Sequence, residues 1–324
     1  MNVLAIETSC DDTAVAVVRA PRQVLSEVVY SQSVHQRFGG VVPEWASRAH
    51  CEQIVPTVRA ALHEAGVSRP DLVAVTAGPG LVGAVLVGLS YAKGAAIGWD
   101  VPLVAVHHLE GHLLSALLED PAPCFPFLSL VVSGGHTTLY AAREVGQYEV
   151  LSTTVDDAVG EAFDKVARLL GLGYPGGPGV ERLAREGRDN IPFPMPRPAG
   201  RPHDLSFSGL KSAVRQHIER NPGTRPADVA ASFQATVARY LSLRVREAAE
   251  RTGLDSIAIG GGAAANTAIR EAIGGTGLRA FLPRRGRCTD NAAMIANVAI
   301  RRLEAGFGVS SFGVTAHTVP EVKD

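Results

Sequence analysis

Short apolar runs and longer segments with helical spacing alternate along the first third of the chain. The run at residues 3–7 is almost wholly apolar, which is typical of a strand buried on both faces. Within residues 47–65 an apolar stripe predicts an amphipathic helix, and its residues are Ile54, Val55, Val58 and Leu62. We expect strands at residues 3–7, 14–18, within 24–34, 72–76 and 103–106, and helices at 47–65 and 81–98.

Three glycines, Gly83, Gly88 and Gly94, interrupt the helix expected at residues 81–98. Glycine in a helix interior costs about 0.8–1 kcal/mol relative to alanine. The glycines therefore predict that this helix approaches a sheet or another helix closely.

The second half of the chain repeats the order of the first. A repeated βββαβα order predicts an α/β fold of two tandem domains with a cleft between them. We expect an N-terminal domain of residues 1–106 plus 295–324, and a C-terminal domain of residues 107–294 with an irregular insertion at 171–208. In this half we expect strands at 127–132, 137–142, 148–153, 256–259 and 278–282, and helices at 157–170, 209–220, 227–251, 263–273 and 291–305.

Composition places the chain among globular α/β proteins. The formal net charge of the 324 residues is −1, so total charge does not indicate a nucleic-acid partner. No basic segment precedes the first strand, and no uninterrupted apolar stretch is long enough to span a bilayer. This favours a soluble cytoplasmic protein that does not act at a membrane. The cysteines lack CxxC spacing, which argues against a disulfide framework and a zinc ribbon; they are Cys10, Cys51, Cys124 and Cys288.

The sequence VAVHHLEGHLLSALL at residues 104–118 contains a distinctive group of polar side chains. If a helix begins near His108, then His108 and His112 lie one turn apart on one face, where two imidazoles can bind one transition metal. Glu110 points to a different face and does not occupy the base position of an H-E-x-x-H motif. Two polar residues at the solvent end of a helix are an equally good interpretation, because a metal site needs a third protein ligand.

Two glycine-rich turns are candidates for binding phosphate. Residues 133–137, SGGHT, offer consecutive backbone N–H groups for an anion, although two glycines also suit a plain hairpin turn. Residues 260–265 fit G-x-G-x-x-A, but Arg284 and Arg285 stand where a dinucleotide site needs an acidic residue. A nicotinamide cofactor is therefore not favoured, although this loop still lets a nucleotide approach the backbone.

Three polar side chains of the second half have both a structural and a ligand-binding interpretation. Asp164 lies on an expected helix, where its neighbours Glu161 and Lys165 form an exposed pair. Asn266 stands at a helix start, where it can bond a ribose hydroxyl or only begin the helix. Asp290 directly precedes a helix, so it is either an N-cap or a third metal ligand.

Nine motifs recur in one order between Met1 and about Gly306. They are IETSCDDTAVAV, GGVVPEWASRAH, AGPGLVGAVLVGLSYAKG, HHLEGH, LVVSGGHTTLY, GEAFDKVARLLGLGYPGGP, FSGLKSAV, IGGGAAAN and TDNAAMIA. Together they closely resemble the bacterial tRNA N6-adenosine threonylcarbamoyltransferase family. The architecture resembles the actin, Hsp70 and sugar-kinase superfamily, with its RNase H-like domains. In that superfamily nucleotide phosphates lie between two hairpin tips, here expected at residues 8–13 and 133–136.

The resemblance implies two actin-like domains and a specific reaction. The threonylcarbamoyl group of threonylcarbamoyl-adenylate passes to N6 of the adenosine on the 3′ side of the anticodon, in tRNAs that read ANN codons. The resemblance implies one divalent metal, iron(II) or sometimes zinc, held by His108, His112 and Asp290. The adenylate is expected in the cleft, in contact with Val131, Val132, Ser133, Gly134, Gly135, Asp164, Gly177, Glu181 and Asn266, although relatives often carry Asp in place of Glu181.

The resemblance also implies partners. These are tRNA, an inactive paralogue that forms a heterodimer through the N-terminal half, and a small P-loop ATPase, while a separate enzyme makes the adenylate. The helix at residues 47–65 is a candidate surface for the paralogue. No general base is assigned, and Glu110 and Asp11 are the candidates. The basic residues that could contact tRNA phosphates are Arg197, Arg201, Lys211, Arg284, Arg285 and Arg287.

Three other functions fit parts of the pattern. A metalloprotease needs a glutamate directly after the first histidine, which the chain lacks. A sugar kinase or ATPase shares the expected fold but does not need paired histidines. A non-enzymatic scaffold would tolerate the loss of His108 and Asp290.

Overall fold

The computed structural model describes residues 1–198, 201–318 and 322, and its contacts divide the chain into two compact units. The first unit is Met1–Ala122, Val145–Gln147 and Asp290–Asp324, and the second is Pro123–Glu144 and Tyr148–Thr289. Residues 107–122, 145–147 and 290–294 thus belong to the first unit, whereas we expected them in the second. Residues 107–122 and 290–294 do so because the helix beginning at His108 packs against the last helix of the chain.

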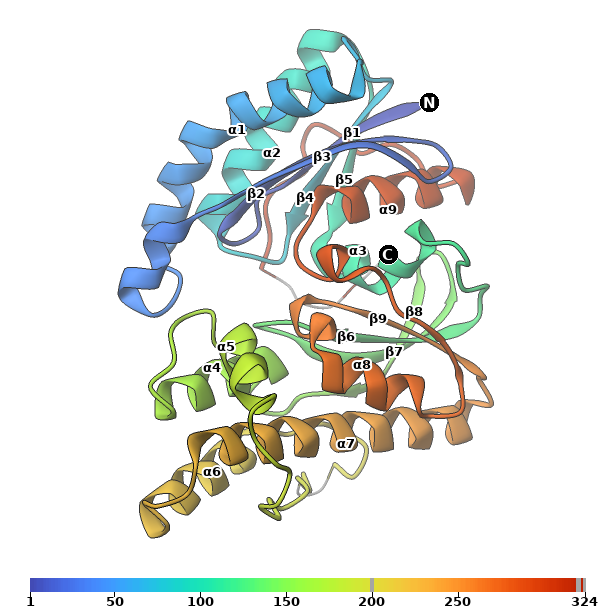
Figure 1. Cartoon of the computed structure of the whole chain (residues 1–324). Helices are drawn as coiled ribbons and strands as arrows, with labels where there is room; N and C mark the ends of the chain where they lie inside the picture. Colours follow the sequence, from blue (N-terminus) through green and yellow to red (C-terminus); the bar gives the residue numbers. More distant parts are fainter. Residues whose placement is uncertain (199–200, 319–321, 323–324) are drawn as a thin grey trace. The chain divides into compact units, whose positions relative to one another are not determined.

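The first unit contains a mixed sheet of five strands. They are β1 (Asn2–Glu7), β2 (Asp12–Arg19), β3 (Gln23–Ser31), β4 (Leu72–Gly78) and β5 (Leu103–His107). The order across the sheet is β3-β2-β1-β4-β5 (Figure 1). The hairpin pairs β1–β2 and β2–β3 are antiparallel, and the pairs β1–β4 and β4–β5 are parallel.

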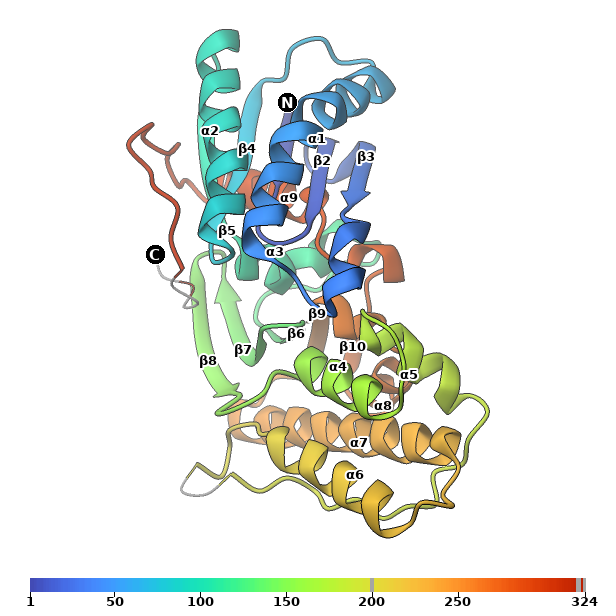
Figure 2. The same ribbon diagram turned by 90° about the vertical axis from the view of Figure 1, so that its left-hand side faces the viewer.

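Helices cover both faces of this sheet. α1 (Pro43–Ala65) and α2 (Val82–Trp99) pack together over one face, and α9 (Ala292–Glu304) covers the other, as Figures 1 and 2 show from two sides. Leu4 and Ile6 of β1 belong to the core beneath α1 and α2. Because both faces are covered, successive residues of β1 and β2 are buried alike, which explains their uninterrupted apolar runs.

The glycines of α2 fit the expectation of close approach in two of three cases. A Cβ atom at Gly88 would lie 2.3 Å from Thr8 Oγ1, and one at Gly83 would lie 2.5 Å from Ser47 Oγ. The prediction is wrong for Gly94, where a Cβ would meet only open space. The two crowded glycines let α2 lie against the loop after β1 and against α1.

A short helix, α3 (His108–Leu114), continues directly from β5 and packs against α9. Gly111 allows this contact, because a Cβ atom there would lie 3.0 Å from Met294 Cγ of α9. The 3-10 turn η2 (Ser115–Leu118) follows α3, and another, η1 (Ser33–Phe38), precedes α1. The packing of α3 on α9 brings together segments that are about 180 residues apart in the chain.

The second unit contains a sheet of the same design. Its strands are β6 (Phe127–Val132), β7 (Thr137–Glu144), β8 (Gln147–Thr153), β9 (Ser256–Gly260) and β10 (Arg279–Phe281). The order β8-β7-β6-β9-β10 repeats the order of the first sheet, with β6 antiparallel to β7 and parallel to β9. This topology confirms the expected duplication of an α/β domain.

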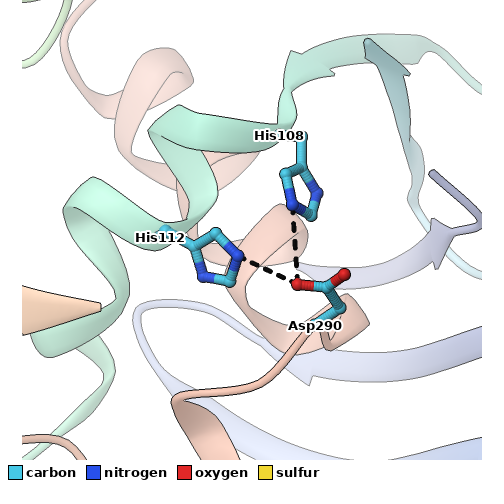
Figure 3. A group of neighbouring side chains, drawn as sticks. All are labelled: His108, His112 and Asp290. Carbon is cyan, nitrogen blue, oxygen red and sulfur yellow. Dashed lines mark hydrogen bonds and ion pairs between the residues drawn. The ribbon is translucent and has the colours of Figure 1, made fainter. Parts of the chain in front are cut away.

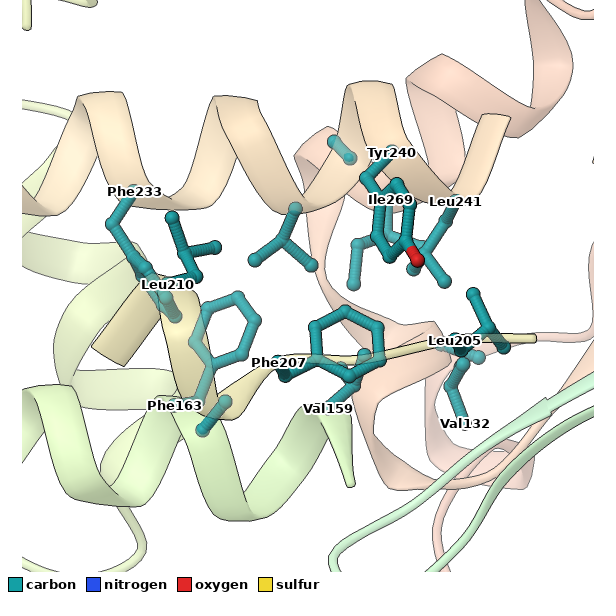
Figure 4. Close-up of a cluster of buried hydrophobic side chains, with 14 of the residues drawn as sticks. Val132, Val159, Phe163, Leu205, Phe207, Leu210, Phe233, Tyr240, Leu241 and Ile269 are labelled. Carbon is teal, nitrogen blue, oxygen red and sulfur yellow. The ribbon is translucent and has the colours of Figure 1, made fainter. Parts of the chain in front are cut away.

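The helices of the second unit enclose its largest core. They are α4 (Val159–Leu169), α5 (Gly176–Ala184), α6 (Ser208–Arg220), α7 (Pro226–Thr252) and α8 (Thr267–Gly274). Aromatic rings fill this core edge to face (Figure 4). The ring centroids of Phe163 and Phe233 are 5.0 Å apart, and those of Phe207 and Tyr240 are 5.6 Å apart.

Two sequence predictions for this unit are wrong. Residues 176–184, inside the stretch expected to be irregular, form α5, because Val180 and Ala184 supply a buried helical face despite the surrounding glycines and prolines. The helix expected at 263–273 is broken into η3 (Gly262–Ala265) and α8. Asn266 ends the first piece and caps the second, since its side chain accepts a hydrogen bond from the Ile269 N–H.

Among the residues that the structure describes, α2 is the one helix long and apolar enough to cross a membrane by length and composition. It packs against α1 and against β4 of the first unit. The core helix of a soluble protein passes the same test, so this feature does not by itself indicate a membrane.

Replacing Phe233 with alanine should lower the free energy of unfolding by about 3–5 kcal/mol, because the ring is fully buried against Phe163. Urea titration followed by circular dichroism measures this loss. Leu169→Ala on α4 is the control, since Leu169 is 38% exposed and its loss should change the free energy by about 0.5 kcal/mol. Equal losses in the two variants would contradict the described core.

Candidate metal centre and nucleotide pocket

Two histidines and one aspartate converge within the first unit (Figure 3). α3 begins at His108, so His108 and His112 lie one turn apart, as the spacing predicts. Asp290 Oδ1 is 3.0 Å from His112 Nε2 and 3.5 Å from His108 Nε2. One ligand atom from each of the three residues lies within 4.8 Å of the others, so this group could hold a metal ion.

The position of Asp290 follows from the cap of α9. The capping residue is Asn291, whose Oδ1 accepts a hydrogen bond of 2.9 Å from the Met294 N–H. Asp290 precedes the cap, and its carboxylate turns toward His112 and His108. Of the two interpretations left open by the sequence, the N-cap role therefore falls on the next residue.

The donor set fits a divalent transition metal. Two imidazole nitrogens and a carboxylate oxygen suit iron(II) or zinc, and three protein ligands leave coordination positions for a substrate. Three residues lie between the two histidines, which puts them one helical turn apart, and the third ligand comes from the segment that precedes α9. The set therefore matches in residue type and position the ligands that the resemblance implies.

A second carboxylate, Glu7 at the end of β1, lies on the other nitrogen of His108. Glu7 Oε2 is 2.9 Å from His108 Nδ1, and Ser9 Oγ is 3.2 Å from the same nitrogen. Burial alone would lower the pKa of His108, but the charges on Glu7 and Asp290 outweigh burial and raise this pKa to about 9. One weak signal for Glu7 is visible in the sequence, because an ionisable residue ends an otherwise apolar strand.

The two candidate bases have different surroundings. Glu110 is fully buried and forms an ion pair of 2.6 Å with Arg302 of α9, which favours a role in holding α3 to α9. Asp11 lies half-buried in the turn after β1. Its neighbour Asp12, which sequence reasoning missed, is half-buried. This loss of solvent, together with the charges of Asp290 and Asp11, raises the pKa of Asp12 to about 6.

The second unit contains a cavity of about 270 Å³ that involves α4, α5 and the loop before α8. Five of the nine expected adenylate contacts lie in its wall. The lining residues are Gly134, Gly160, Phe163, Asp164, Tyr174, Pro175, Gly177, Pro178, Glu181, Gly262, Ala263, Ala265, Asn266 and Thr289.

The polar side chains of this cavity are held by hydrogen bonds to residues next to its wall. Asp164 Oδ1 accepts a hydrogen bond of 2.7 Å from the Gly176 N–H, and burial raises the pKa of Asp164. Glu181 Oε1 accepts hydrogen bonds from the backbone and the hydroxyl of Thr267. Asn266 donates from Nδ2 to Gln234 Oε1 at 2.7 Å, a contact that no sequence signal indicated.

Four expected adenylate contacts lie outside the cavity wall. Val131 and Val132 are fully buried in β6. Ser133 closes the turn to β7, since its hydroxyl accepts a hydrogen bond from the His136 N–H at 3.1 Å, as in a plain hairpin. Gly135 lies in the same turn, and a Cβ atom added to it would have no atom outside its chain neighbours within 4 Å.

A glycine of α4 brings this turn against the cavity. The Gly160 N–H donates to Ser133 O at 3.1 Å, and a Cβ atom at Gly160 would lie 2.7 Å from Gly134 Cα. Only glycine allows this approach of helix and turn. Gly134 thereby becomes part of the cavity wall, which also contains Asp164 of α4.

Comparison with known proteins connects these features to one family. The family model of tRNA N6-adenosine threonylcarbamoyltransferase matches residues 23–297. A relative of that name from Thermus thermophilus is 50% identical over 322 residues, 98% of each chain. Another from Nostoc sp. is 52% identical over 323 residues, 94% of this chain and 93% of the relative.

Solved structures with low sequence identity share the fold. HypF from T. kodakarensis superposes with a TM-score of 0.64 at 16% identity, over 94% of this chain and 48% of that one. Component A of (R)-2-hydroxyglutaryl-CoA dehydratase from Acidaminococcus fermentans superposes with a TM-score of 0.56 at 15% identity, over 94% and 99%. At these identities the likeness concerns the fold alone, which is an α/β fold of two tandem actin-like domains.

Proteins that share only a fold do not match a family model and do not reach half-identical sequence over nearly the whole chain, as this chain does. The chain belongs to the tRNA N6-adenosine threonylcarbamoyltransferase family.

Proposed function

We propose that this chain transfers the threonylcarbamoyl group of threonylcarbamoyl-adenylate to N6 of the adenosine 3′ to the anticodon, in tRNAs that read ANN codons. N6 attacks the carbamoyl carbon, the new C–N bond forms, the bond from that carbon to the phosphate oxygen breaks, N6 loses a proton and AMP leaves. The observation that carries the proposal is the half-identical sequence of relatives with this name over nearly the whole chain.

Iron(II) is the proposed metal, with zinc as the alternative, at His108, His112 and Asp290. When bound, it supplies a Lewis acid that can orient the threonylcarbamoyl group and polarise its carbonyl. The protein's own contribution is to hold two imidazole nitrogens and one carboxylate oxygen on a common point from α3 and from the start of α9. The types of the three residues and the distances between their ligand atoms support this metal site.

The adenylate is proposed to bind the cavity of the second unit. Asp164 and Glu181 present carboxylate oxygens, which accept hydrogen bonds from ribose hydroxyls, and the glycines of the wall let a flat base approach the backbone. The turn at Ser133, Gly134 and Gly135, together with Val131 and Val132, is proposed for the phosphate side. Because the exocyclic amine of adenine is a weak nucleophile, positioning contributes more than base catalysis in this proposal.

A base remains unassigned in the proposal. Glu110 forms an ion pair with Arg302, which argues against Glu110 as the general base. Asp11 stays a candidate, and Asp12 joins it, because a carboxylate with a pKa of about 6 can accept a proton near neutral pH.

The second unit is the proposed contact surface for tRNA. It carries 21 Lys and Arg against 16 Asp and Glu, while the first unit carries 10 against 16. An excess of basic residues attracts the phosphates of an anticodon stem-loop. The proposed contacts are Arg197, Arg201, Lys211, Arg284, Arg285 and Arg287.

Protein partners are proposed on the first unit. α1, the helix expected to contact the paralogue, and the adjacent α2 expose large apolar side chains, which are Trp45, Val55, Val82, Leu86 and Ile97. A patch of this kind supports pairing with the inactive paralogue, in a complex that also includes a small P-loop ATPase. The cytoplasm is the proposed compartment, since tRNA is modified there. The metalloprotease and kinase alternatives are not favoured by the names of the relatives.

In cells depleted of the endogenous enzyme, the wild-type chain should restore threonylcarbamoyladenosine in total tRNA and His112→Ala should not, because the variant loses one of three proposed metal ligands. Nucleoside mass spectrometry measures the modification. His217→Ala on α6 is the matched control, since His217 belongs to neither proposed site, and it should restore the modification. Full restoration by His112→Ala would contradict the metal assignment.

Asp164→Asn should weaken AMP binding by about 10- to 100-fold, because a hydrogen bond to a charged carboxylate is worth about 1.5–3 kcal/mol. Asparagine keeps an oxygen that can accept from the Gly176 N–H, so the wall stays intact. Isothermal calorimetry with AMP measures the affinity. Glu161→Gln, on the same helix but outside the cavity wall, should leave it unchanged. An unchanged affinity in Asp164→Asn would place the nucleotide elsewhere.

A further inference from the structure

Glu7 lies directly behind one of the proposed metal ligands. Its Oε2 is 2.9 Å from His108 Nδ1, while His108 Nε2 is the nitrogen on the Asp290 side, 3.5 Å from Oδ1. The imidazole therefore lies between two carboxylates, one on each nitrogen. With Glu7 accepting a hydrogen bond from Nδ1–H, the lone pair of the neutral ring is on Nε2, where a metal would bind.

The carboxylate of Glu7 is itself fixed by neighbouring donors. It is 1% exposed, and it accepts a hydrogen bond of 2.5 Å from the Ser9 N–H on Oε1. The Thr76 hydroxyl donates to Oε2, the oxygen that also faces His108. Donors from the loop after β1 and from the neighbouring strand β4 thus set the direction of the carboxylate. These hydrogen bonds hold the carboxylate in one orientation, with Oε2 toward His108.

His112 has no equivalent support. Its Nδ1 is buried and has no hydrogen-bond partner within the described residues. The two histidines thus differ although they share a helix face and both direct Nε2 toward Asp290. A carboxylate on the outer nitrogen raises the basicity of an imidazole ligand and fixes its orientation.

We infer that Glu7 is a positioning residue of the metal centre, which holds His108 as its Nδ1–H tautomer and makes it the stronger of the two imidazole ligands. The inference rests on the metal site proposed above. A purely structural ion pair is the alternative, and it predicts that loss of the Glu7 charge lowers stability without changing metal affinity.

Glu7→Gln separates these roles, because glutamine keeps the shape of the side chain and removes its charge. With Co²⁺ as the probe, competition against a chromophoric chelator should give an affinity for the full-length variant about 10- to 100-fold below that of the wild type. The ligand-field spectrum of bound Co²⁺ should also change. Thermal melting of the metal-free proteins records the accompanying change in stability.

Ser26→Ala is the control for loss of stability alone. Ser26 is buried in the first unit and donates to Ala61 O at 2.7 Å, with no contact to the metal ligands. This variant should melt at a lower temperature and bind Co²⁺ as the wild type does. A Co²⁺ affinity of Glu7→Gln within twofold of the wild type would overturn the inference.

A second measurement uses the wild type, so it tests the inference even if the Glu7→Gln variant does not fold. In ¹⁵N NMR spectra of the Zn²⁺-loaded chain with labelled histidine, His108 should carry a proton on Nδ1 and the metal on Nε2. Zinc on Nδ1 of His108, or no proton there, would overturn the inference. Absence of any Co²⁺ or Zn²⁺ binding by the wild type would instead overturn the proposed metal site, so the two failures are distinguishable.

Discussion

The convergence of two imidazole nitrogens and one carboxylate oxygen within 4.8 Å is the constraint on which the first unit depends. Three features of the fold produce it. α3 begins directly at the end of β5, so His108 leaves the sheet at its edge and His112 follows one turn later. Gly111 allows α3 to pack on α9, and the Asn291 cap leaves Asp290 in front of that helix.

In the second unit, close approach between backbone segments shapes the cavity. Gly160 lets the start of α4 lie on the turn between β6 and β7, and a Cβ atom at Gly176 would lie 2.7 Å from Asp164 Cα. These contacts place a helix, a turn and a loop around one cavity. Its wall combines two carboxylates and the amide of Asn266 with apolar side chains and glycine backbone. This combination suits a nucleoside, because a flat base packs on apolar surface and ribose hydroxyls donate hydrogen bonds to carboxylates.

The sequence was sufficient for most elements and for the spacing of His108 and His112, whereas Asp290 was named as a ligand only through the family resemblance. Buried strands are continuous apolar runs, and the spacing of His108 and His112 is a local helical property. α5 was missed because glycines and prolines obscure its short apolar face, and the break at Asn266 depends on a single cap. Glu7 could not be assigned from the sequence, because its partner His108 lies 101 positions away and only the pairing of strands brings them together.

The proposed function depends on one metal ion bound by the imidazoles of His108 and His112 and by the carboxylate of Asp290. X-ray absorption at the iron K-edge of the full chain, loaded anaerobically with Fe²⁺, measures which atoms surround that ion. We expect one iron per chain, with scattering from two imidazole rings and from oxygen, and one imidazole ring fewer in the variant His112→Ala. A spectrum with sulfur neighbours or without imidazole scattering would contradict this metal site.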